Sequence, residues 1–284
     1  MSYHILKRLG YLLCRMSPQG LDRLARVLTF LVFDLLRLRR RLMLRNLTIA
    51  LGDETTPQQR VKIARESMRN FFLTILETLR AVDTDVLADI TVEGQEHALP
   101  ALEAGQGAYM LACHQGNWEV LAGAGRPYGA HTHGLVKEIG KGGVNQLVDE
   151  LRRRNGWTPI YRKPATKAIR EIRAALKQNG WVAFMMDQAR PGAPKLPFLG
   201  QPAKTLTLLA SIWRKHPAPV IPVTIRRISP TRHHIKAWPP LEFKRLDDPK
   251  QADIENTLLC NQMLEKMIRD CPEQYFWLHN RWKD

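Results

Sequence analysis

The residues best suited to chemistry in this sequence are His114 and Glu119, five positions apart in the stretch GAYMLACHQGNWE (107–119). Histidine accepts a proton near neutral pH, and a carboxylate bonded to its second ring nitrogen fixes the tautomer and stabilises the imidazolium. We expect a strand over 108–113 and a helix that starts near Asn117, which would carry Glu119 back to His114. Alternatively, the histidine caps a strand end and the glutamate favours a helix amino terminus.

Other common kinds of catalytic or metal site find little support in the sequence. None of the five serines lies in a G-x-S-x-G elbow, and there is neither a P-loop nor a G-x-G-x-x-G motif. Cys113 should point away from His114 into the core, because neighbours on a strand face opposite sides. The four cysteines show no metal-ligand spacing, and His131 and His133 lack a third ligand, so we expect no metal. His233 and the histidine after it read as a solvated pair on an edge strand.

Short apolar runs alternate with helical stretches after residue 84, which predicts an α/β fold with a mostly parallel central sheet flanked by helices. The last two strands could form an antiparallel edge hairpin. The expected strands are 90–92, 108–113, 132–136, 158–161, 181–187, 220–226 and 234–238. The expected helices are 95–103, 117–123, 144–154, 165–178, 205–215 and 254–269.

Three of these strands should end at one edge of the sheet, where open α/β sheets hold ligands. His114, Lys137 and the pair Asp187-Gln188 follow them. A base without a protein nucleophile suggests that a bound hydroxyl attacks an activated acyl group such as a thioester directly. Basic groups near the edge could bind phosphate or stabilise the oxyanion, although each could also be a solvated charge. The candidates are Lys137, Arg153, Arg162 and Lys204. The loop 188–204 is rich in Pro and Gly, and is a candidate substrate-covering loop.

The amino-terminal region reads as helical and strongly basic. The chain carries a formal charge of +16, and residues 1–50 hold ten Lys and Arg against Asp22 and Asp34. Such a charge implies an acidic partner: nucleic acid, anionic lipid or an acidic carrier protein. The stretch 21–47 mixes Leu, Val and Phe with arginines, as in a helix that lies in a membrane interface, or else packs on the protein's own core. Its longest uncharged run, 27–33, is far too short to cross a bilayer.

A second helix is expected over 57–82. We therefore divide the chain into a helical, membrane-interface region (1–84) and an α/β domain (85–284), and expect them to form one integrated unit. A cleaved signal peptide is not indicated. Few aromatic residues are placed to stack on bases beside the basic helix, so a nucleic-acid partner is not expected.

Six segments carry a resemblance to a known family. They are RRRLMLRNLTIAL (39–51), VEGQEHALPAL (92–102), ACHQGNWE (112–119), WVAFMMDQ (181–188), PFLGQPAKT (197–205) and PEQYFWLHNRWK (272–283). Together they resemble motifs of the bacterial lipid A biosynthesis (lauroyl/myristoyl) acyltransferases, within the glycerolipid acyltransferase group. The His-x4-acidic element is common to many acyltransferases, whereas the ordered set is specific.

The resemblance implies an enzyme that moves a fatty acyl chain to a hydroxyl of a membrane lipid, most simply a lipid A precursor, without a cofactor. The implied donor is an acyl carrier protein thioester or acyl-CoA, and the implied place is the cytoplasmic face of the bacterial inner membrane, peripheral or shallowly anchored. His114 is the implied base and Glu119 its orienting partner. Motif residues expected to bind substrate are Asn117, Asp187, Gln188 and Thr205.

This sequence departs from the family pattern at two places. Lys137 stands in a segment that usually carries an arginine, and charged residues interrupt the apolar anchor that is common in the family. Relatives also acylate other acceptors, so a lysophospholipid, an ornithine-type lipid or another glycolipid remains an alternative. A relative that has lost catalysis and serves as a scaffold is disfavoured, because His114 and Glu119 are both present.

Overall fold

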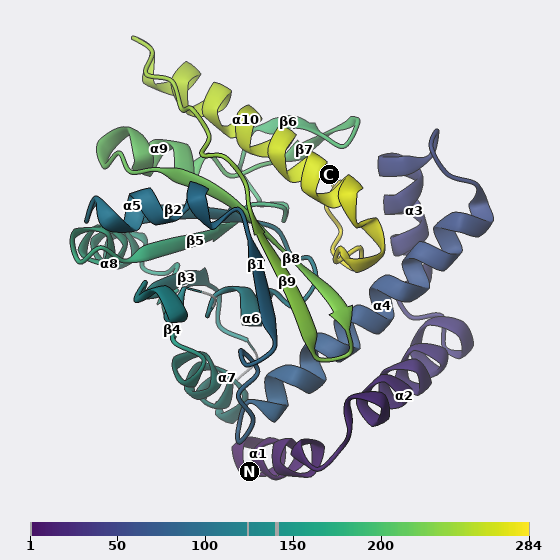
Figure 1. The fold of residues 1–284 in the computed structure, drawn as a ribbon. Coiled ribbons are helices and arrows are strands. Elements are labelled where there is room, and N and C mark those ends of the chain that lie inside the picture. The colour runs from purple at the N-terminus through teal and green to yellow at the C-terminus, as the bar shows by residue number, and fades with distance from the viewer. Residues whose placement is uncertain (1, 124, 140–141, 284) are drawn as a thin grey trace.

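The computed structural model describes residues 2–123, 125–139 and 142–283. Its centre is a seven-stranded sheet of order β1-β9-β8-β2-β5-β3-β4 (Figure 1). The strands are β1 (Ile90–Glu93), β2 (Ala108–Ala112), β3 (Thr132–Val136), β4 (Trp157–Tyr161), β5 (Trp181–Met185), β8 (Val220–Ser229) and β9 (Arg232–Ala237). Every neighbouring pair is parallel except β8 and β9. The predicted α/β fold is confirmed.

The β8–β9 hairpin is antiparallel as expected but does not form the edge of the sheet. β1 adds to β9 in parallel, with Ile90 paired to His233, and so becomes the edge strand. The prediction of a solvated histidine pair is therefore wrong for His233, which is 2% exposed and contacts Glu77 through Nε2 at 3.1 Å. A histidine on a covered strand needs such a partner, because burial removes water from its ring nitrogens.

Two hydrophobic clusters cover the two faces of the sheet, because side chains alternate along each strand. One cluster contains Tyr109 and Leu111 of β2 and packs under helices that include α8 (Ala165–Lys177), α9 (Leu208–Lys215) and α10 (Pro249–Asp270). The other contains Ala108, Met110 and Ala112 of β2. On that side lie the short helices α5 (Leu99–Glu103) and α6 (Trp118–Leu121). The helix α7 (Gly143–Arg154) links β3 to β4.

The amino-terminal region is helical, as predicted, but 21–47 is not one helix. It contains the end of α2 (Pro18–Thr29), a π-helical segment η1 (Phe30–Leu35) and the start of α3 (Arg40–Leu51). Arg37 and Arg39 lie between η1 and α3 and have φ values of 53° and 62°. This left-handed conformation ends a right-handed helix. α1 (Ser2–Cys14) precedes this segment. In the part of the chain that the structure describes, no helix combines the length and the apolarity that membrane spanning needs.

The helix expected at 57–82 is α4 (Pro57–Arg80), which opens with a capping box between Thr56 and Gln59. Met68 of α4 and Met43 of α3 belong to the same hydrophobic cluster as Tyr109 of the sheet. The helical region and the α/β region thus share a core. The division at residue 84 stays a prediction.

The loop 188–204 is more ordered than a free covering loop. It contains a hairpin of β6 (Lys195–Phe198) and β7 (Gln201–Lys204). Phe198 is fully buried and Asn261 of α10 donates a hydrogen bond to the carbonyl of Pro197, so the hairpin is tied to α10. Leu196, Phe198, Leu199 and Ala203 are buried and fix the hairpin, whereas Pro191, Gly192, Pro194 and Lys195 are exposed. The expectation of a substrate-covering loop stays a prediction.

Candidate active site

His114 pairs with Asp187. β2 and β5 are parallel neighbours with Ala112 opposite Met185, so the residues two positions beyond each strand lie side by side. His114 Nδ1 is 2.8 Å from Asp187 Oδ1, and the His114 backbone N–H donates to Oδ2 at 3.2 Å. Burial alone would raise the pKa of the Asp187 carboxyl, but the charge of His114 and these hydrogen bonds hold its pKa below its ordinary value. With Nδ1–H directed at the carboxylate, His114 Nε2 is left to accept a proton.

Glu119 does not orient His114, and that part of the sequence interpretation is wrong. Its two carboxylate oxygens accept hydrogen bonds from Arg152 of α7, Oε1 from Nη2 at 2.8 Å and Oε2 from Nε at 3.0 Å. Burial lowers the pKa of Arg152, but the neighbouring Glu119 outweighs it, so the net shift is upward. The guanidinium also lies over the Trp157 ring, 4.8 Å from its centroid. α6 directs Glu119 toward α7 rather than back along β2.

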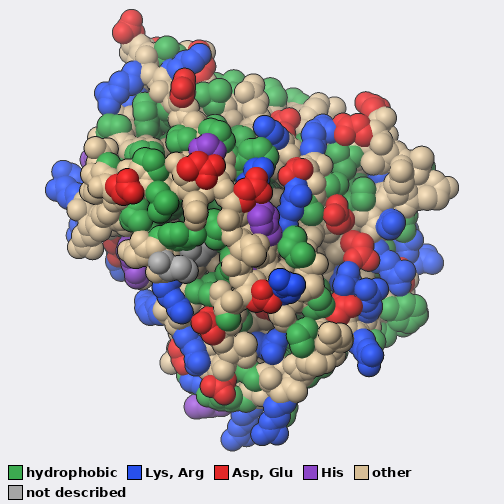
Figure 2. Space-filling model, in the orientation of Figure 1, with side chains coloured by type: hydrophobic (Ala, Val, Ile, Leu, Met, Phe, Trp, Pro, Cys, Tyr) green, Lys and Arg blue, Asp and Glu red, His purple; other side chains and the backbone are tan. Residues whose placement is uncertain are grey.

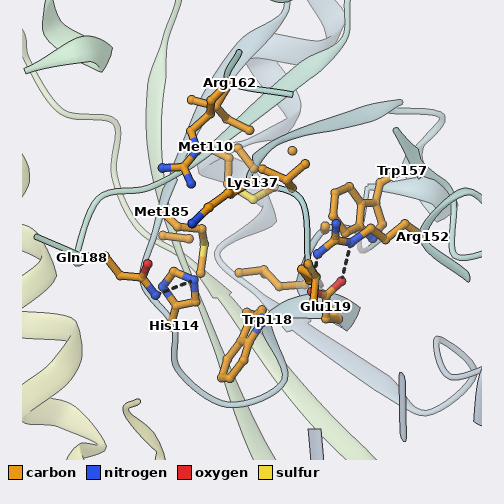
Figure 3. A pocket seen from close by; sticks show the side chains of 18 of the residues that line it. Met110, His114, Trp118, Glu119, Lys137, Arg152, Trp157, Arg162, Met185 and Gln188 are labelled. Carbon is orange, nitrogen blue, oxygen red and sulfur yellow. Dashed lines mark hydrogen bonds and ion pairs between the residues drawn. The ribbon is translucent and has the colours of Figure 1, made fainter. Parts of the chain in front are cut away.

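His114, Glu119 and Arg152 line the same pocket, a cavity of about 300 Å³ at the carboxyl end of the central strands. Figure 3 shows His114 and Gln188 on one side and Glu119 with Arg152 on the other. The Gln188 side-chain nitrogen is 3.4 Å from His114 Nε2, a long contact that a substrate hydroxyl can displace. The lining is mixed: charged groups stand beside apolar ones, which include Met110, Leu121, Ala183, Met185 and Phe276. Such a pocket suits a ligand with a polar head and a hydrocarbon tail.

Three cations in this pocket have no carboxylate partner among the ion pairs of residues 2–123, 125–139 and 142–283: Lys137, Arg162 and Arg190. Burial and the nearby Arg190 lower the pKa of Arg162 to about 10. Figure 3 shows the side chains of Lys137 and Arg162 reaching toward the side on which His114 and Gln188 lie. Uncompensated guanidinium and ammonium groups of this kind favour a phosphate or a developing oxyanion.

The loop that carries His114 is held by distant segments. Gln115 donates to the backbone carbonyls of Met267 and Cys271, and the Phe276 N–H donates to the His114 carbonyl at 2.9 Å. The next residue, Gly116, has φ 57°, and a Cβ there would collide with the Ile225 carbonyl oxygen.

The side chains that meet the ring of His114 come from the same segments. Trp118 and Phe276 pack against it with centroids 5.4 and 6.1 Å away. The loop therefore fixes the His114 ring in both position and orientation.

Besides Asp187, which lies behind His114, four expected substrate-binding residues do not line the pocket. Asn117 is buried, caps α6 and donates to Glu77 Oε2 at 2.7 Å. Arg153 is exposed on α7, one step round the helix from Arg152. Lys204 and Thr205 lie at Arg281, which donates to the Lys204 carbonyl and to Thr205 Oγ1, both at 2.6 Å. These four predictions are wrong about contact with the pocket, because the side chains are used in the core or point to solvent.

Lys137, Arg162 and Gln188 line the pocket, as expected. Asp187 does not contact the pocket as a substrate-binding residue would, because it is 1% exposed and is used as the partner of His114. The sequence interpretation missed Arg152, Arg190, Trp118 and Phe276 as pocket residues. Arg190 follows the Asp-Gln pair by two positions, and Phe276 belongs to the motif at 272–283, so signals for both were present. His131 and His133 are neighbours with ring centroids 4.8 Å apart. In the described ranges, no three His, Cys, Asp or Glu side chains gather as metal ligands would.

Comparisons with known proteins find similar chains. A family model described as bacterial lipid A biosynthesis acyltransferase matches residues 6–284. The lipid A biosynthesis palmitoleoyltransferase of Escherichia coli K12 is 25% identical over 236 residues, which is 80% of this chain and 73% of that protein. The lipid A biosynthesis acyltransferase of Shigella flexneri gives the same values. Among solved structures, the 1-acyl-sn-glycerophosphate acyltransferase PlsC of Thermotoga maritima aligns with 89% of this chain and 96% of its own, at 15% identity and a TM-score of 0.38.

Proposed function

The chain belongs to the bacterial lipid A biosynthesis acyltransferase family, and on that premise we propose that it moves a fatty acyl chain from a thioester to a hydroxyl of a lipid A precursor. The observation that carries this proposal is the His114–Asp187 pair, 2.8 Å apart at the mouth of a half-apolar pocket. It supplies the general base that the reaction needs. The donor is an acyl carrier protein or CoA thioester.

The reaction needs no covalent intermediate on the protein. His114 Nε2 takes the proton of the acceptor hydroxyl while its oxygen attacks the thioester carbonyl, and Asp187 stabilises the imidazolium that forms. The tetrahedral intermediate collapses when the carbon–sulfur bond breaks. The leaving thiolate then takes the proton from His114, so the base returns to its starting state and the products are an ester and a thiol.

The pocket's two halves suit the two parts of such substrates. The cations Lys137, Arg162 and Arg190 would bind phosphate groups, which a carrier thioester, CoA and a phosphorylated lipid all possess. The apolar half would hold hydrocarbon. Glu119 has a different role from the one expected. Arg152 holds its carboxylate on the side of the pocket opposite His114, where it can accept a hydrogen bond from a sugar hydroxyl.

We also propose that the amino-terminal helices rest on an anionic membrane surface. Ile5, Leu9 and Leu12 of α1 are at least 40% exposed and recur at helical spacing, so they share one face. Phe30 and Leu31 of η1 are 51% and 40% exposed, with Leu35, Leu36 and Leu38 beyond them. Figure 2 shows Lys and Arg side chains gathered at the lower right of the molecule, where Figure 1 places α2. Apolar side chains flanked by cations are typical of interfacial helices.

The central experiment replaces His114. His114→Ala should lower kcat by about 100-fold to 10,000-fold with acyl carrier thioesters and a lipid A precursor, because the general base is lost. His131→Ala is the matched control, since that exposed imidazole lies outside the pocket. Product is measured by mass spectrometry. Full activity in His114→Ala would contradict the mechanism.

Two further measurements separate the remaining alternatives. Offering a total lipid extract shows whether the lipid that gains mass is a lipid A precursor, a lysophospholipid or an ornithine-type lipid. Flotation with anionic vesicles tests the membrane surface. Phe30→Ser/Leu31→Ser should bind about tenfold more weakly than the wild type, because half-exposed apolar area is lost, and unchanged binding would contradict the proposed face.

A further inference from the structure

A second cavity lies beside the active-site pocket on the same face of the sheet. Its volume is about 60 Å³, and apolar side chains make up most of its wall. They come from β8, β9, β1 and the segment around α5: Val92, Ala98, Leu99, Leu102, Val223, Ile235 and Ala237. Trp181 and Tyr128 close other sides. Nothing in the acyl-transfer mechanism uses this cavity.

Among the described residues, Met110 is the side chain that lines both cavities. It is 3% exposed and belongs to one hydrophobic cluster with the walls of the two. In the sheet it stands between Ile221 of β8 and Ala183 of β5. The two cavities are therefore neighbours across β2, with the Met110 side chain between them.

The residues beside Met110 explain why the first pocket is open on one side of it. Ala183 on β5 and Gly134 on β3 lie at the same level of the sheet and have little or no side chain. A Cβ at Gly134 would lie 2.5 Å from the Trp157 ring, so Trp157 already occupies that side. The trough over Gly134 and Ala183 thus has Trp157 as one wall and Met110 as the other.

Resting on the proposed function, we propose that the donor's acyl chain runs from His114 along this trough and that Met110 sets its preferred length by separating the trough from the second cavity. The four residues from His114 back to Met110 span about 13 Å of strand. An extended hydrocarbon of roughly ten methylenes covers that length, at about 1.3 Å per carbon. A longer chain must displace the Met110 side chain, or bend away from it. Methionine is flexible, so this barrier discriminates by degree.

The test varies the donor with a fixed acceptor. Met110→Ala should join the two cavities. For two donors that differ by several methylenes, the kcat/KM of the longer donor divided by that of the shorter one should then rise at least about tenfold. Met110→Val, a smaller truncation that suits a strand, should shift it less in the same direction. Unchanged chain-length preference in two folded variants would overturn the inference.

Two controls separate this effect from general loosening of the core. Met43→Ala removes the same side chain from the other hydrophobic cluster and should leave the preference unchanged. In Met110→Ala/Ala98→Leu, the new leucine fills the second cavity without lining the first, so the preference should return toward the wild type.

The acceptor supplies a second arm, because it also carries hydrocarbon. Acceptors with acyl chains of different length are offered with one donor. If Met110→Ala changed the preference for acceptor chain length but left the preference for donor chain length unchanged, the inference would be overturned. Failure of the proposed function is distinguishable, because the wild type would then transfer no acyl chain from any thioester.

Discussion

The two sides of the pocket carry the same kind of contact but can do different chemistry. On one side Asp187 holds His114, and on the other Glu119 holds Arg152; the shortest nitrogen–oxygen distance is 2.8 Å in both pairs. Histidine exchanges its proton near neutral pH, whereas arginine stays charged. The first pair can therefore move a proton, and the second can only present a fixed charge distribution. What each carboxylate can do in the site thus depends on the residue that it contacts, His114 for Asp187 and Arg152 for Glu119.

Breaking the His114–Asp187 pair should have the largest effect on kcat. Asp187→Asn keeps the shape but no longer holds the proton on Nδ1 or stabilises the imidazolium, so kcat should fall about 10,000-fold. Asp253→Asn is a matched control, because Asp253 bonds Arg214 at 3.1 Å outside the pocket. The variants are compared by initial rates of ester formation. A loss of less than tenfold in Asp187→Asn would show that the base works without this carboxylate.

Breaking the second pair should affect stability more than the chemical step. Glu119→Gln leaves the Arg152 guanidinium, whose side chain is 5% exposed, with an uncharged group in place of its closest carboxylate and with Asp149 3.7 Å away. We expect unfolding free energy to fall by about 3 kcal/mol, measured by urea denaturation.

The double variant Glu119→Gln/Arg152→Met removes the guanidinium that has lost its closest partner and should recover much of that loss. If the double variant were no more stable than the single one, the pair would not be a structural unit. A fall in kcat as large as that of Asp187→Asn would end the contrast between the two sides.

The side of the pocket with His114 should also be the more sensitive to mild acid. The Ala189 N–H donates to His279 Nε2 at 3.0 Å, which fixes the chain just beyond Asp187. Burial is the main reason that the pKa of His279 falls from 6.5 to about 4, although Asp187 opposes it. As the pH falls, the unfolded chain is protonated at His279 before the folded chain is. The contribution of this group to the unfolding free energy is therefore fully present above pH 6.5 and is lost as the pH falls toward 4. At pH 5 the loss from this group is about 2 kcal/mol.

The measurement compares urea midpoints at pH 7 and pH 5. His279→Gln cannot take up the proton and should lose about 2 kcal/mol less than the wild type over that interval. His133, whose pKa is also lowered to about 4 by burial, remains in both proteins and contributes equally. Equal losses in the two proteins would exclude His279 as the acid-sensitive group.

The sequence predicted the alternating elements and the sheet edge well, because both follow from hydrophobic periodicity and turn residues. It could not predict the partner of His114. That contact depends on β2 and β5 being neighbours, and the strand order of the sheet does not follow the chain. The sequence favours Glu119 as that partner because it is near His114 along the chain, yet the one-turn helix α6 directs it to α7.

The basic residues of α7 are a second case in which the sequence does not show which side chain faces the site. Arg152, Arg153 and Arg154 are adjacent in the sequence, but about 100° of rotation per residue sends them to different surroundings. Arg152 is buried at the pocket, while the other two are exposed. Which of three consecutive arginines faces inward depends on the angle at which α7 packs, which no local pattern records.

The way in which the His114 loop is held also bears on the folding order of the protein. His114 meets a carboxylate 73 residues away, and Gln115 donates to a carbonyl 156 residues away. Contacts between such distant parts of a chain form late, because a large loss of chain entropy must precede them. The His114–Asp187 pair is therefore assembled only when the sheet and the segment at 271–276 have both docked. A partly folded chain would hold its histidine unaligned, so it would not consume activated acyl groups before it could deliver them to a lipid.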